Sequence, residues 1–104
     1  MAEHCIQVFL KLSTEHGSDK DRDRIEALTE KFADAIEKYE AGEFDGDEYG
    51  GGFCRLFMYG LDADKLFDAI KKPLLASPLS KGGYIVKRYG EASDTDCKEV
   101  RVDL

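Results

Sequence analysis

The sequence predicts a single α+β domain in which two helices cover one face of a sheet. The chain has 104 residues, enough for one sheet-and-helix core but too few for two. Its 42% hydrophobic and 11% aromatic residues are typical of a globular protein. Apolar residues recur at every second position in some segments and at every third or fourth position in others, as in strands and amphipathic helices.

The first two predicted elements are a strand and a helix. Residues 5–12 alternate, so that one face of this strand is aliphatic. Ser18 then precedes an acidic first turn, where its hydroxyl can accept a hydrogen bond from a free N–H group. The apolar positions that follow recur at helical steps: Ile25, Leu28, Thr29, Phe32, Ala35, Ile36 and Tyr39. We expect an amphipathic helix with its apolar side on the sheet.

The rest of the chain predicts four more strands and a shorter helix. The strands are residues 42–49, 53–59, 84–89 and 98–104, with residues 94–96 in a loop. Asp62 is expected to cap the helix after the second of these strands. Pro73 and Pro78 are expected to keep that helix short, because proline has no N–H to donate and its ring clashes with the preceding turn.

This order of elements favours a ferredoxin-like βαββαβ sandwich with an extra C-terminal strand. Right-handed crossovers would place both helices on one face of a mixed antiparallel sheet. The other face of the sheet would then be open.

Charge and cysteine content restrict the class of partner. A net charge of −7 repels nucleic acid and anionic membranes and attracts basic partners. The three cysteines are Cys5, Cys54 and Cys97, and their wide spacing indicates neither a disulfide framework nor a zinc site. No apolar run is long enough to span a bilayer, and residues 1–12 lack the pattern of a signal peptide. We therefore expect a cytoplasmic protein without membrane contact.

The stretch GEFDGDEYGGGF, residues 42–53, contains four carboxylates and five glycines. Counted from Asp45, it has the glycine of a calcium loop at the sixth position, but Leu56 stands where the closing glutamate belongs. It does not lead into a helix N-terminus, as a phosphate-binding loop does, and its acids repel phosphate. We expect a hairpin or bulge whose carboxylates protect an exposed sheet edge, with no metal or cofactor.

The sequence shows no constellation of catalytic side chains. His4 and His16 are too far apart in the chain to be read as a pair. No cysteine stands in a pattern that would hold a base against its thiol. We therefore expect no catalytic residue and no enzymatic activity.

The open face of the predicted sheet carries most of the candidate binding residues. Those expected to point away from the helices are Phe9, Lys11, Phe53, Arg55, Phe57 and Tyr59. A monomer seldom leaves such an aromatic patch bare. A protein partner, a second copy or the chain's own C-terminal segment is expected to cover it.

Residues 51–59 (GGFCRLFMY) and 8–13 (VFLKLS) resemble the two aromatic strands of the RNA-recognition motif. Phe9 and residues 52–54 fit that pattern, as does Leu56. Gly51 replaces its basic residue, and Arg55 and Met58 replace aromatics. This resemblance implies single-stranded RNA binding through the aromatic face.

Residues 44–70 are also similar to small uncharacterised bacterial ferredoxin-like domains, some of which resemble immunity proteins of toxin systems. This resemblance implies a binding role. Residues 40–48 contain five acids and no base, and residues 71–88 contain five bases and no acid. The acidic run adds four candidate binding residues: Glu43, Asp45, Asp47 and Glu48.

The sequence thus predicts a non-enzymatic protein-interaction domain that binds a basic partner or a second copy. The alternatives are single-stranded RNA binding, or a small enzyme or ligand-binding dimer with a pocket between two open sheets.

Overall fold

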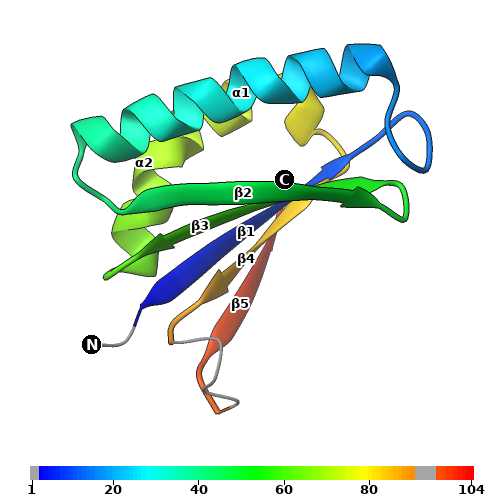
Figure 1. Ribbon diagram of the computed structural model, residues 1–104. Coiled ribbons are helices and arrows are strands. Elements are labelled where there is room, and N and C mark those ends of the chain that lie inside the picture. Colours follow the sequence, from blue (N-terminus) through cyan, green and yellow to red (C-terminus); the bar gives the residue numbers. More distant parts are fainter. Residues whose placement is uncertain (1–2, 91–95) are drawn as a thin grey trace.

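Five strands form one sheet, and two helices lie over one of its faces (Figure 1). The computed structural model describes residues 3–90 and 96–104, so residues 94 and 95 of the expected loop lie outside the described residues. In chain order the elements are β1 (His4–Lys11), α1 (Asp19–Lys38), β2 (Glu43–Gly50), β3 (Phe53–Gly60), α2 (Ala63–Ala76), the 3₁₀-helix η1 (Pro78–Ser80), β4 (Tyr84–Arg88) and β5 (Glu99–Asp103).

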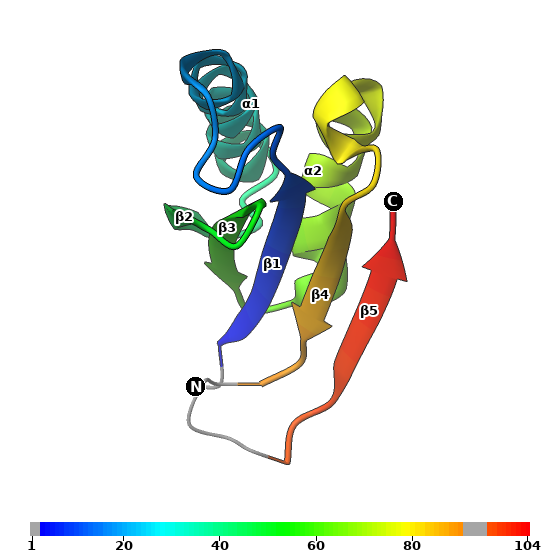
Figure 2. The same cartoon turned by 90° about the vertical axis from the view of Figure 1, so that its right-hand side faces the viewer.

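The strand order across the sheet is β2-β3-β1-β4-β5. All neighbouring strands are antiparallel, so the expectation of a mixed sheet was wrong. The first four strands have the ferredoxin-like arrangement, and β5 adds a strand beside β4 (Figure 2). The predicted fold class is confirmed.

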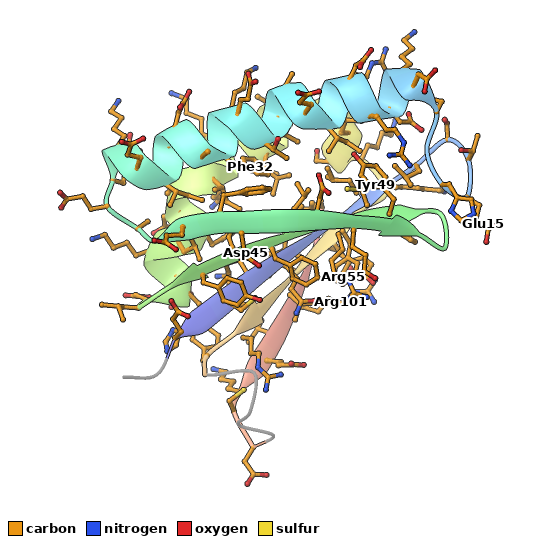
Figure 3. All side chains as sticks on the ribbon, in the orientation of Figure 1. Glu15, Phe32, Asp45, Tyr49, Arg55 and Arg101 are labelled. Atoms are coloured by element: carbon orange, nitrogen blue, oxygen red, sulfur yellow. The ribbon has the colours of Figure 1, made fainter. Side chains whose placement is uncertain are left out.

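The core lies between the sheet and the helices. Side chains with no exposed area include Ile6, Val8 and Leu10 from β1, and Cys54, Leu56 and Met58 from β3. Phe32 of α1, also fully buried, lies between that helix and the sheet (Figure 3). The alternation predicted for β1 and β3 therefore matches the faces that the structure buries, except that Cys5, on the opposite face, is also buried.

Helix α1 begins with a reciprocal cap. The hydroxyl of Ser18 accepts a hydrogen bond from the Asp21 N–H at 3.1 Å, and the Asp21 carboxylate accepts one from the Ser18 N–H at 3.2 Å. The same carboxylate accepts the Ser13 hydroxyl at 2.6 Å and the Ser13 N–H at 2.9 Å. These bonds lower the pKa of Asp21 to about 2, and those from Ser13 have the largest effect.

Helix α2 is longer than expected, because it passes through Pro73 and ends at Ala76. The side chain of Leu74, in the turn that contains this proline, is fully buried. Packing of that turn against the core offsets the missing N–H of the proline. The predicted cap is confirmed, since the Asp62 carboxylate accepts from the N–H of Asp64 at 2.9 Å.

Strand β2 contains a β-bulge between Phe44 and Gly46. Phe44 and Tyr49 are five positions apart, so an unbroken strand would place them on opposite faces. The bulge adds one residue to β2 at Asp45, and both aromatic side chains then pack against the core. A two-residue turn, Gly51 and Gly52, joins β2 to β3, and both glycines have positive φ, at 61° and 82°. Of the two predicted alternatives, a hairpin or a bulge, the glycines form the hairpin, and the bulge lies separately at Asp45.

Within the described ranges, neither helix is long and apolar enough to cross a bilayer.

Candidate functional site

The sheet face opposite the helices is the candidate site, and we call it the open face. Arg55 and Arg101 lie on this side of the sheet, whereas Phe32 and Tyr49 lie on the helix side (Figure 3). Strand β5 pairs with β4 edge to edge and so extends the sheet. Leu104, just after β5, packs against the core. The described C-terminal residues therefore do not lie over the open face.

Aromatic rings and guanidinium groups lie next to one another across the open face. The rings of Phe9 and Tyr84 are stacked, with centroids 4.4 Å apart and planes 14° apart. The guanidinium of Arg55 lies 5.0 Å from the Phe9 centroid and 5.6 Å from that of Phe57. The guanidinium of Arg101 lies 3.9 Å from the Tyr84 centroid. We call these five side chains the aromatic column; cation–π attraction and ring stacking hold it together.

A hollow of about 240 Å³ lies beside the column. Its lining residues are Phe9, Glu48, Gly50, Phe53, Arg55 and Tyr84. Two of these residues, Phe53 and Tyr84, meet edge to face with centroids 5.9 Å apart. The hollow thus combines three aromatic walls, one carboxylate and one guanidinium.

The structure brings together four of the six open-face residues predicted from the sequence. These are Phe9, Phe53, Arg55 and Phe57. Lys11 lies at the end of β1 with an exposed side chain. Tyr59 lies towards the other end of β3, opposite Cys5 in the register, and burial raises its pKa.

The four predicted acidic residues all lie on the edge strand β2, but on both of its faces. Glu43 pairs with the outward Tyr59, and Glu48 pairs with the outward Arg55. Asp47 pairs with the buried Leu56, which places it on the helix side. The carboxylate of Asp45, at the bulge, contributes to the raised pKa of Tyr59. One face of the sheet therefore carries only part of this acidic run.

Tyr84 and Arg101 were missed in the sequence analysis, although they complete the column. In a ferredoxin-like sheet β4 borders β1. Ile85 is buried, so its neighbour Tyr84 points to the opposite face of the sheet. Combining that order with the period of two would have placed Tyr84 beside Phe9. Arg101 could be placed only once the register between β4 and β5 was known.

Other polar groups contribute to the stability of the fold. The imidazole Nδ1 of His4 accepts a hydrogen bond from the Ala63 N–H at 3.0 Å, at the start of α2. Asp64 of α2 accepts from Tyr89 at 2.6 Å and from Lys87 at 3.1 Å, and the first of these bonds raises the pKa of Tyr89 to about 12. Cys54 is fully buried, and this burial raises its pKa to about 11. Among the described residues, no three His, Cys, Asp or Glu side chains form a group that could hold a metal ion.

Comparison with protein-family models, curated proteins and solved structures finds no match to this chain.

Proposed function

We propose that this chain is a non-enzymatic protein-interaction domain that binds a basic protein through the open face. The observation that carries the proposal is the aromatic column. Its three rings, those of Phe9, Phe57 and Tyr84, are each half-buried, and no described segment covers them. A patch of this kind is typical of a surface that another protein covers.

Charge selects the type of partner. The chain has a net charge of −7, and the edge strand beside the open face contributes Glu43 and Glu48 on that side. Long-range attraction brings a basic surface to this edge and disfavours an acidic one. The similarity of residues 44–70 to small ferredoxin-like domains, some of which resemble immunity proteins, implies the same kind of role.

Single-stranded RNA is the second candidate, because outward aromatics on β1 and β3 form the platform on which the RNA-recognition motif stacks bases. In this chain, however, the column occupies ring faces that bases would need. Phe9 and Tyr84 stack on each other, and the guanidinium groups of Arg55 and Arg101 lie against the same two rings. Together with the acidic charge, this favours a protein partner over RNA.

The cytoplasm is the compartment that we propose. Cys5, Cys54 and Cys97 are all free thiols, and free thiols are maintained in a reducing compartment.

The proposal is tested with Phe57→Ser, at the end of the column. Leu75→Ser is the matched control, because Leu75 of α2 is 54% exposed on the helix layer. Proteins captured by the immobilised wild-type domain are identified and purified, and their affinities for the two variants are measured. We expect Phe57→Ser to weaken binding of a basic protein at nearly unchanged melting temperature, and Leu75→Ser to bind like the wild type.

Three outcomes would contradict the proposal. The first is equal binding by the wild type and Phe57→Ser. The second is a dimer in sedimentation that Phe57→Ser dissociates, which would make a second copy the occupant. The third is micromolar binding to mixed-sequence single-stranded RNA at physiological salt that Phe9→Ala abolishes.

A further inference from the structure

We infer that the hollow receives an arginine side chain of the partner, whose guanidinium pairs with Glu48 and stacks on the ring of Phe53. This inference rests on the proposed function and specifies its central contact. It begins from the relation between Glu48 and Arg55, which face each other in the register of β2 and β3.

Glu48 and Arg55 are cross-strand neighbours of opposite charge, and such neighbours usually pair. Here the guanidinium of Arg55 lies over Phe9 and Phe57 instead. Within residues 3–90 and 96–104, no cation lies within ion-pair distance of the Glu48 carboxylate. The hollow therefore presents an exposed carboxylate whose own arginine is engaged elsewhere.

The walls of the hollow suit a flat cation. Phe9, Phe53 and Tyr84 supply its aromatic lining, and Glu48 supplies its carboxylate. Phe53 does not belong to the column, so its ring is the wall that a guanidinium can stack on. Gly50, at the rim, has no side chain, and nothing lies within 4 Å of the position that its Cβ would take. A volume of about 240 Å³ admits the end of a side chain but not a helix or strand.

Arginine fits this environment better than lysine. Its planar guanidinium can stack on a ring and donate two parallel hydrogen bonds to one carboxylate, whereas an ammonium is a strongly hydrated point charge. The open face already holds two guanidinium groups against aromatic rings, those of Arg55 and Arg101.

The charge of Arg55 opposes a second cation in the hollow. Removing this repulsion should therefore have a measurable effect on binding. Replacing Arg55 with methionine keeps an apolar stem over Phe9 but removes the charge. Arg55→Met is therefore expected to strengthen binding of an arginine side chain, whereas it would weaken binding of an anion.

The probe is N-acetyl-arginine methylamide, titrated into the ¹⁵N-labelled protein, with the neutral citrulline analogue as its control. We expect saturable shifts at the amides of Gly50, Phe53 and Tyr84 with the arginine probe, and none with the citrulline probe. Glu48→Gln should weaken binding about threefold, the scale of an exposed ion pair. Glu43→Gln, on the same face of the same strand, should leave it unchanged.

Any of three results would overturn the inference. The amide shifts could centre on Glu43 and not on Gly50, the two glutamine variants could lose equal affinity for the arginine probe, or Arg55→Met could bind that probe more weakly than the wild type does. The failure of the inference can be told apart from failure of the proposed function. Suppose a partner binds Glu48→Gln with the same affinity as the wild type but does not bind Phe57→Ser. That result would agree with the proposed function and disprove the arginine contact.

Discussion

The ring of Phe9 on β1 lies parallel to the ring of Tyr84 on β4, with centroids 4.4 Å apart. The two residues are direct partners in the antiparallel register. The stack connects the two halves of the chain on the face away from the helices. It also means that each ring shields one face of the other from solvent and from any ligand.

We expect Phe9 and Tyr84 to be energetically coupled. A double-mutant cycle of Phe9→Leu and Tyr84→Leu, measured by denaturant unfolding, should give a coupling free energy of about 1 kcal/mol, the scale of a stacked aromatic pair. The control cycle combines Phe9→Leu with Phe44→Leu, whose ring packs on the helix side. That cycle should be additive to about 0.5 kcal/mol. Equal coupling in the two cycles would show that the stack contributes nothing specific.

Asp21 should make the fold sensitive to acid. Its pKa is lowered from 3.8 to about 2 by hydrogen bonds from Ser13 and Ser18. A group whose pKa is lower in the folded state stabilises that state above its unfolded pKa, and this contribution is lost as pH falls through the folded pKa. Asp21→Asn should therefore lower the melting temperature at pH 7, and its difference from the wild type should shrink between about pH 4 and pH 2.

The control for this prediction is Asp19→Asn, which removes a charge from the same first turn. In the described structure, Asp19 accepts no capping hydrogen bond. It should show a smaller difference from the wild type at pH 7. A difference for Asp21→Asn that is constant from pH 7 to pH 2 would contradict this account of the cap.

The hairpin between β2 and β3 should depend on its two central glycines. Gly51 and Gly52 have φ of 61° and 82°, a region that costs a residue with a Cβ roughly 1–2 kcal/mol. Gly51→Ala and Gly52→Ala should each lower the free energy of unfolding by about that amount. Gly50→Ala, where φ is not positive and the surrounding space is open, should change it far less. A similar loss in all three variants would point to a cause other than backbone conformation.

Calcium, magnesium and zinc at millimolar concentration should leave the melting temperature unchanged. Asp45 lies close enough to Tyr59 to raise its pKa, whereas Asp47 pairs with the buried Leu56 and so lies on the helix side. The two carboxylates are therefore poorly placed to share an ion, and a ligand stabilises a fold only by binding it. A rise that disappears in the double variant Asp45→Asn, Asp47→Asn would show an ion site in this strand.

Local patterns in the sequence were sufficient for much of the fold. The alternation in β1 and β3 placed Ile6 inward and Phe9 outward, because successive side chains of a strand point to opposite faces. Ser18 and Asp62 marked the starts of both helices, because a cap depends only on residues within one turn. Gly51 and Gly52 marked the hairpin for the same reason, since their role is set by local backbone geometry.

Tertiary structure alone decided the features that depend on distant residues. Helix α2 continues past Pro73 because the core buries Leu74, an effect that outweighs local propensity. The bulge at Asp45 turns both Phe44 and Tyr49 inward, and its position follows from pairing with β3. Arg101 reaches the ring of Tyr84 because β5 pairs with β4 in one particular register. The residues that complete the candidate site come from strands far apart in the chain, and only the folded sheet determines which of them become neighbours.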